Sequence, residues 1–82
     1  MFLAKVYVTL KPVVNDPEGL TIAGGLRSLG FSDVEDVRSG KYLEIRLTAA
    51  DRSAAVTQVD EMCRKLLANP VIEDYRFEVA EA

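Results

Sequence analysis

The side chains that could do chemistry in this 82-residue chain are few. It contains no His and a single Cys, Cys63. His is the usual general base and the commonest metal ligand, so its absence argues against a catalytic triad or a zinc centre. Activation of Cys63 would depend on Arg64 or Lys65, which point elsewhere on a helix, so we interpret Cys63 as a buried structural thiol. The sequence therefore predicts no catalytic residues.

Three acidic residues, Asp33, Glu35 and Asp36, fall within four positions and raise the possibility of a divalent-cation site. A hard cation takes six or more oxygens that converge from different parts of the chain. Neighbouring side chains of an extended segment point to opposite sides, so these carboxylates would not converge. We interpret them as solvated charges and expect no metal.

Gly24 and Gly25 could suggest a phosphate-binding loop, but such loops precede a helix, and these glycines fall inside a predicted one. We interpret them as allowing close approach of the helix to a sheet or a partner. Arg38 and Lys41 flank Ser39-Gly40, where they are either solvated or contact an acidic partner or a phosphate. A partner-docking site is predicted at the hairpin and at a corner near the C-terminus, formed by Arg38, Gly40, Lys41, Tyr42, Asn69 and Pro70.

The elements that must position these residues can be read from the apolar pattern. Alternation predicts a first strand over 2–11, and Asp16-Pro17-Glu18 predicts a helix start, with Ile22 or Ala23, Leu26 and Leu29 facing inward and Gly30 at the end. Ser39-Gly40 predicts a hairpin turn between strands 34–38 and 41–47. A second helix begins at Thr48 or Asp51 and stops at Asn69-Pro70. Its apolar stripe consists of Ala55, Val59, Met62 and Leu66, widened by Val56, Cys63 and Leu67. The last strand is predicted over 71–79.

This order predicts a single α+β domain over residues 1–82, with a ferredoxin-like βαββαβ fold. The fold would be a four-stranded antiparallel sheet with both helices on one face. The other face would be open and polar, and we predict that it mediates self-association through Lys5, Tyr7, Thr9, Glu44, Arg46 and Arg76. Its tyrosines resemble the stacking aromatics of RNA-binding domains, but a net charge of −3 argues against nucleic acid.

The first residues show no basic segment followed by a continuous apolar one, so we expect no targeting signal. No apolar run approaches the roughly 20 residues needed to span a bilayer, so we expect no membrane insertion. The lone Cys fits a reducing compartment, and a cytoplasmic location is expected. A chain this short hides little surface, so oligomer contacts are an expected supplement to its stability.

Four motifs in order resemble the PurS family, the small subunit of phosphoribosylformylglycinamidine synthase. They are Lys5-Val-Tyr-Val-Thr-Leu-Lys11 with Asp16-Pro17-Glu18-Gly19, then Ser28-Leu-Gly-Phe31, then Val37-Arg-Ser-Gly-Lys-Tyr42, and Leu66-Leu-Ala-Asn-Pro-Val-Ile-Glu-Asp-Tyr75 preceded by Met62-Cys63. The resemblance covers essentially the whole chain. Val13-Val14 departs from it, because relatives carry Gly or another small residue there.

The resemblance implies a non-catalytic accessory subunit in purine biosynthesis. It implies partnership with a glutaminase subunit and with a synthetase subunit that uses ATP and magnesium, and assembly as a homodimer or tetramer. This chain would bind no cofactor itself. Two alternatives share the element order. One is an ACT-like dimeric regulatory domain, although Val13-Val14-Asn15 is a poor ligand loop. The other is an acylphosphatase-like enzyme, whose phosphate loop needs an Arg that the first loop lacks.

Overall fold

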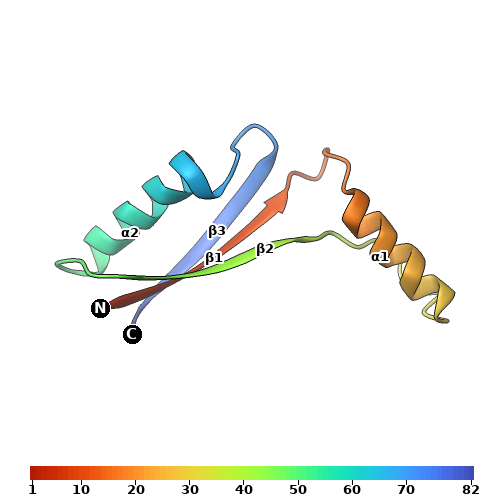
Figure 1. The fold of residues 1–82 in the computed structure, drawn as a ribbon, viewed down its shortest axis with the longest axis horizontal. Coiled ribbons are helices and arrows are strands. Elements are labelled where there is room, and N and C mark those ends of the chain that lie inside the picture. Colours follow the sequence, from red (N-terminus) through yellow and green to blue (C-terminus); the bar gives the residue numbers. More distant parts are fainter.

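The computed structural model describes all 82 residues, and its three strands form one antiparallel sheet in the order β2-β1-β3. The elements are β1 (Phe2–Leu10), α1 (Pro17–Ser28), β2 (Gly40–Leu47), α2 (Arg52–Met62), the π-helical turn η1 (Cys63–Leu67) and β3 (Glu73–Glu81). Helix α2 lies over one face of the sheet, whereas α1 projects beyond its end (Figure 1). The α+β class is confirmed.

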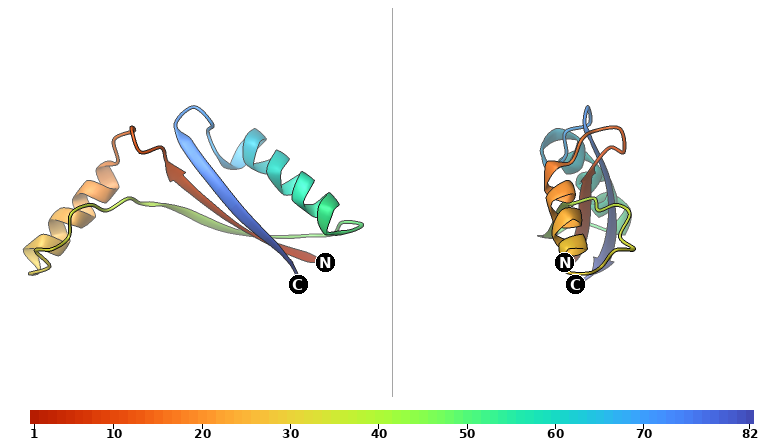
Figure 2. Two further views of the ribbon diagram at one scale, coloured as in Figure 1. Left: turned by 180° about the vertical axis from the view of Figure 1, so that it is seen from behind. Right: turned by 90° about the vertical axis from the view of Figure 1, so that its right-hand side faces the viewer.

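The predicted four-stranded, ferredoxin-like sheet is not confirmed. Residues 34–38 form no strand, and β2 starts at Gly40 without a strand before it, so the predicted hairpin at Ser39-Gly40 is wrong. The two helices do not share one face, because α1 leaves the sheet and the chain returns alongside it (Figure 2).

The projection of α1 from the sheet is explained by a set of hydrogen bonds at the base of this helix. We call the two segments that form them, residues 11–16 and 37–39, the neck. The Asp16 carboxylate accepts hydrogen bonds from the backbone N–H of Ser39 at 2.7 Å and from its hydroxyl at 3.1 Å. The Arg38 guanidinium donates to the carbonyls of Lys11 and Val14 at 3.0 and 2.9 Å. These bonds join the chain entering α1 to the chain returning from it. They consequently hold residues 17–36, the arm, away from the sheet.

Local signals fix both ends of α1 as the sequence predicts. Asp16 is the N-cap and accepts from the N–H of Gly19 at 2.9 Å, and Pro17 occupies the first helical position. Gly30 has φ of 101°, and its N–H and that of Phe31 donate to the carbonyls of Arg27 and Leu26, each at 3.1 Å. This is a Schellman motif, in which a left-handed glycine satisfies the last carbonyls.

Helix α2 starts at Asp51, which accepts from the N–H of Ala54 at 2.8 Å, so Asp51 and not Thr48 is the N-cap. Its last turn is π-helical, with the N–H of Ala68 donating to the Cys63 carbonyl at 3.0 Å. A π turn is wider than an α turn and shifts the residues that follow around the axis. Leu67 therefore packs against the core, while the predicted inward residue Leu66 is 82% exposed.

The hydrophobic core lies between α2 and one face of the sheet, as the strand alternation predicts for β1. It contains no residue of α1, and consists of Phe2, Ala4, Val6, Val8, Leu47, Ala55, Val59, Cys63, Ala68 and Val79. In α1 only Gly19 and Ala23 are buried, so Ala23 and not Ile22 faces inward. The prediction that Leu29 is a core residue is wrong, since it is 77% exposed.

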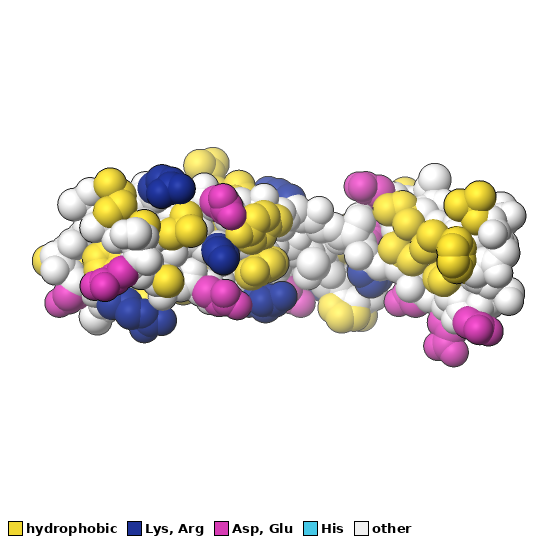
Figure 3. All heavy atoms as spheres, turned by 90° about the horizontal axis from the view of Figure 1, so that it is seen from below, with side chains coloured by type: hydrophobic (Ala, Val, Ile, Leu, Met, Phe, Trp, Pro, Cys, Tyr) yellow, Lys and Arg dark blue, Asp and Glu magenta, His cyan; other side chains and the backbone are white.

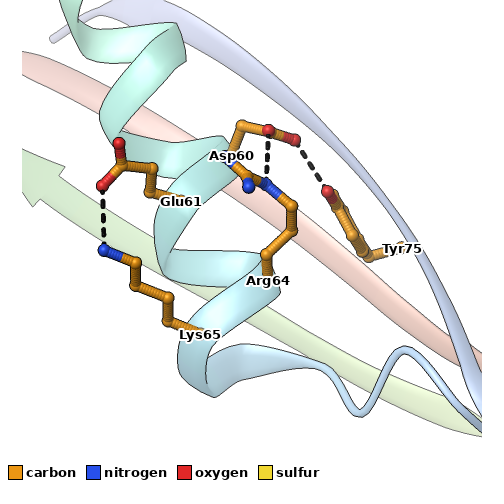
Figure 4. A network of polar contacts seen from close by, with 5 residues as sticks. All are labelled: Asp60, Glu61, Arg64, Lys65 and Tyr75. Carbon is orange, nitrogen blue, oxygen red and sulfur yellow. Dashed lines mark hydrogen bonds and ion pairs between the residues drawn. The ribbon is translucent and has the colours of Figure 1, made fainter.

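A polar network fastens α2 to β3 at the edge of this core (Figure 4). The Tyr75 hydroxyl donates to Asp60 at 2.7 Å, and Arg64 donates to the same carboxylate at 2.9 Å. Acceptance of the Tyr75 hydrogen bond, followed by that of Arg64, lowers the pKa of Asp60 below its ordinary value. Glu61 and Lys65 form an exposed ion pair beside it at 3.4 Å. Burial raises the pKa of the Cys63 thiol, which supports the structural interpretation of that residue.

Two valines at different depths test where the stability resides. Val59 is fully buried, so Val59→Ala should lower the free energy of unfolding by about 1–3 kcal/mol, through lost apolar burial and a residual cavity. The matched control Val71→Ala removes the same atoms from a side chain that is 79% exposed, and should change it by less than about 0.5 kcal/mol. Urea unfolding monitored by circular dichroism measures both. Equal effects would contradict this assignment of the core.

Candidate functional site

The face of the sheet opposite α2 is uncovered and carries alternating polar side chains. The register pairs Lys5 with Glu44 and Glu78, and Tyr7 with Tyr42 and Arg76. The six residues predicted for the open face do lie together on it: Lys5, Tyr7, Thr9, Glu44, Arg46 and Arg76. Their position thus follows from strand alternation alone.

An aromatic row crosses the middle of this open face. The rings of Tyr7 and Tyr42 lie 5.1 Å apart at an angle of 43°, and the Arg76 guanidinium lies 4.0 Å from the centre of the Tyr7 ring. Cross-strand aromatic and cation–π contacts of this kind rigidify a sheet surface. The row lines a shallow depression of about 360 Å³, to which Thr9, Lys41 and Asp74 also contribute.

One tyrosine of the row has a perturbed acidity. The Tyr42 hydroxyl donates to Glu44 at 2.8 Å, and loss of this hydrogen bond on ionisation raises the pKa of Tyr42 to about 12. Tyr42 is therefore a neutral hydrogen-bond donor over the whole physiological range and not a base. The arrangement suits contact with another surface.

The six predicted docking residues do not form one patch. Gly40, Lys41 and Tyr42 open β2, but Lys41 pairs with Val8 on the α2 side of the sheet, while Tyr42 lies on the open face. Asn69 and Pro70 lie in the turn before β3, at the same end of the sheet but at its other edge. A Cβ at Gly40 would collide with the Val8 carbonyl, so this glycine is required by packing against β1.

Arg38 has a structural role that the sequence analysis missed. Its guanidinium is engaged by two backbone carbonyls of the neck, and Ser39 is engaged by Asp16. Donation by the backbone N–H groups of Gly19 and Ser39 lowers the pKa of Asp16, and burial opposes this effect only in part. Asp16 could be identified from the sequence as a helix cap, but nothing in the sequence indicates its long-range bond to Ser39.

The side chains that could bind a metal do not gather. No group of three or more His, Cys, Asp or Glu residues is placed to hold an ion. None of the helices is long and apolar enough to cross a membrane. What distinguishes the molecule is its shape: a half-covered sheet and a projecting arm.

These features define a small α+β protein with two prominent exposed surfaces, the open face of the sheet and the projecting arm. A sequence model described as PurS, phosphoribosylformylglycinamidine (FGAM) synthase, matches residues 3–81. The chain belongs to the PurS family, whose members are subunits of that ligase of purine biosynthesis.

Individual relatives agree over nearly the full length. The chain is 52% identical over 81 residues to phosphoribosylformylglycinamidine synthase subunit PurS of Bacillus subtilis, covering 99% of this chain and 95% of that one. It is 43% identical over 79 residues to the subunit of Methanocaldococcus jannaschii, covering 96% and 95%.

Solved structures give the same answer for the fold. A Bacillus subtilis PurS crystal structure matches with a TM-score of 0.86 at 52% identity, covering 99% of this chain and all of the other. A chain in the structure of PurLQS from Thermotoga maritima matches with a TM-score of 0.88 at 32% identity, covering 96% of each. These matches favour the accessory-subunit interpretation and give no support to the ACT-like alternative.

The Asp16 carboxylate in the neck should make the stability of the protein depend on pH, and replacing Asp16 by Asn should remove this dependence. Because the folded-state pKa of Asp16 is lowered, its stabilisation is present above its ordinary pKa of 3.8 and is lost as the pH falls through the folded-state value. Asp16→Asn should lower the melting temperature by several degrees near pH 7. This deficit should shrink as the pH falls below 3.8 toward the lowered folded-state pKa, where the wild-type carboxylate becomes protonated.

Thermal unfolding of both proteins between roughly pH 2 and 7 measures the deficit. Asp36→Asn is the matched control, because Asp36 is exposed and contributes to no side-chain hydrogen bond. A deficit that stayed constant over the whole range would show that Asp16 does not act through its charge.

Proposed function

We propose that this chain is the non-catalytic accessory subunit that holds a glutaminase and an ATP-dependent synthetase together in phosphoribosylformylglycinamidine synthase. The observation that carries the proposal is membership of the PurS family over residues 3–81, joined to the match with a chain of the PurLQS structure. Ammonia released from glutamine would be delivered to formylglycinamide ribonucleotide. The synthetase, not this chain, would use ATP and magnesium.

The physical requirement behind such a subunit is protection of a nucleophile. Ammonia released into water near neutral pH is largely protonated, and the ammonium ion cannot attack an electrophile. Transfer therefore needs two active sites joined by a path from which water is excluded. An accessory chain meets this need by raising the effective concentration of one catalyst near the other.

The molecule has the properties of a rigid connector. The Asp60 network fixes α2 on the sheet, and the neck fixes the arm, so surfaces far apart in the chain keep a set orientation. The principal-axis extents are 50 × 27 × 14 Å, which gives an elongated body able to contact two partners at separate places. The single buried free thiol, Cys63, fits work in the reducing cytoplasm.

For docking, we propose the sheet end that carries Gly40, Lys41, Tyr42 and the Asn69-Pro70 corner. Lys41 is exposed there and makes no ion pair, so it is free to contact an acidic partner. Arg38 is assigned to the neck, where it positions this end of β2.

For self-association into a dimer or tetramer, we propose that the open sheet face contributes through Lys5, Tyr7, Thr9, Glu44, Arg46 and Arg76. Three cations (Lys5, Arg46, Arg76) and three carboxylates (Glu44, Asp74, Glu78) share this face, and Lys5 lies directly opposite Glu44 and Glu78. A second copy would therefore meet a surface without net charge.

Omission of this chain from a reconstituted complex tests the bridging role. Product formation driven by glutamine should fall by about 100-fold or more, because the two catalysts no longer share one assembly. Product formation driven by added ammonium salt should persist, since the synthetase then needs no glutaminase. Equal rates with glutamine in the presence and absence of the chain would refute the bridging role, and loss of both activities would indicate a role inside the synthetase site.

Charge reversal at Lys41 tests the docking surface. Lys41→Glu should weaken binding to the synthetase or the glutaminase by about tenfold at low salt, the size expected of one charge at the rim of an interface. Lys65→Glu is the control, because it reverses an exposed charge on η1 that is not among the proposed docking residues. Surface plasmon resonance with the immobilised chain measures both. Identical affinities for the two variants would remove Lys41 from the interface.

A further inference from the structure

The depression on the open face of the sheet lies at a step between two neighbouring rows of side chains. Across the three strands the register aligns one row of Gly40, Thr9 and Asp74, and beside it the aromatic row of Tyr42, Tyr7 and Arg76. The first row is low because its side chains are small, and Gly40 has none. The aromatic row is high, because it carries two rings and a guanidinium. The depression between them, about 360 Å³ in volume, has the size of a small-molecule site.

The aromatic side of the depression is held in place and is open to a ligand. Tyr42 is 49% exposed. Its ring lies 5.1 Å from that of Tyr7, and its hydroxyl is held by Glu44 at 2.8 Å. A ring fixed at both its side and its tip loses little conformational freedom when a ligand binds it. Flat heteroaromatic rings stack on such side chains, and this stacking favours nucleobases as a class.

Arg76 adds a cation that has no counter-ion in this chain. Its guanidinium lies 4.0 Å from the centre of the Tyr7 ring and forms no ion pair, whereas Asp74 is paired with Lys11 at 3.5 Å. A guanidinium held against a ring keeps its N–H groups available, and these match the oxygens of a phosphate. Seen from below, cationic, acidic and apolar side chains are interspersed over the sheet (Figure 3), so no broad basic surface surrounds this site. The site therefore suits one anionic group and not a polyanion.

We propose that this depression binds a mononucleotide, whose base stacks on the rings of the aromatic row and whose phosphate accepts hydrogen bonds from Arg76 and the Thr9 hydroxyl. A mononucleotide combines a flat ring with one anionic group, which are the two features that the depression places side by side. A longer nucleic acid would need a stripe of cations along its backbone, and the net charge of −3 argues against one. This binding goes beyond the bridging role and does not depend on it.

Titration of the isotope-labelled full chain with adenosine monophosphate, followed by two-dimensional NMR of the amide groups, tests the site. The signals of Thr9, Gly40, Tyr42 and Arg76 should move together and saturate, with a dissociation constant of about 1 mM or lower. Adenosine alone and inorganic phosphate alone should each bind about tenfold more weakly or worse, because each occupies only one half of the site. A short oligoadenylate that bound about tenfold more tightly than the monophosphate would assign the depression to nucleic acid and overturn the proposal.

Substitutions in the aromatic row provide the direct test. Arg76→Gln should raise the dissociation constant for adenosine monophosphate by about tenfold or more, since it removes the charged donor. Arg46→Gln is the matched control, because Arg46 is also an unpaired cation of the open face but does not line the depression, and it should leave the constant within about twofold. Tyr42→Leu keeps an apolar side chain without the flat ring and should weaken binding by about fivefold or more. Circular dichroism should show an unchanged fold in all three.

Two results would overturn the mononucleotide site. One is the absence of saturable shifts up to about 20 mM adenosine monophosphate, and the other is equal affinity of Arg76→Gln and Arg46→Gln. Tyr7, Thr9 and Arg76 also belong to the face proposed for self-association, so the titration uses the chain at about 50 µM or less, where a competing second copy is scarce. Because this assay uses the chain alone, its failure would leave the bridging role, tested by omission from the complex, unaffected.

Discussion

The shape of the whole molecule depends on one buried carboxylate. Asp16 accepts from the start of α1 and, 23 residues later in the chain, from the backbone and hydroxyl of Ser39. Arg38 completes the neck by binding the carbonyls that precede α1. Because these polar groups satisfy one another only when the two segments run side by side, they fix the direction of the arm. An apolar helix can therefore stand clear of its own sheet.

The core can be small because it has to support only half of the chain. Strand β1 supplies a buried row, and α2 covers it with Ala55, Val59 and Cys63. The arm, residues 17–36, contributes nothing to this core, so its apolar side chains can face outward. A larger protein would bury such apolar surface in its own interior. A chain of 82 residues can bury it only by contact with another molecule.

Much of the local structure could be predicted from the sequence, because short-range chemistry determines it. The caps at Asp16 and Gly30 and the alternation of β1 follow from residue types and spacing. The errors concern long-range pairing. Residues 34–38 have the composition of a strand, but a strand also needs a neighbour, and here Arg27 of α1 donates to the carbonyls of Val34 and Glu35 instead. Leu29 fits an inward position by periodicity, yet periodicity does not say whether the surface it would cover lies in the same chain.

For the predicted surface residues, too, local patterns gave correct positions and long-range contacts were missed. Lys5, Tyr7 and Arg76 reach one face because strand alternation places them there. The sequence suggests grouping Arg38 with Lys41, because both are cations near one turn, but the backbone carbonyls of the neck bind the Arg38 guanidinium. A cation bound in this way orients a surface without being part of it. The orientation of the arm relative to the sheet thus depends on the neck, because Asp16 and Arg38 hold these two parts of the chain together.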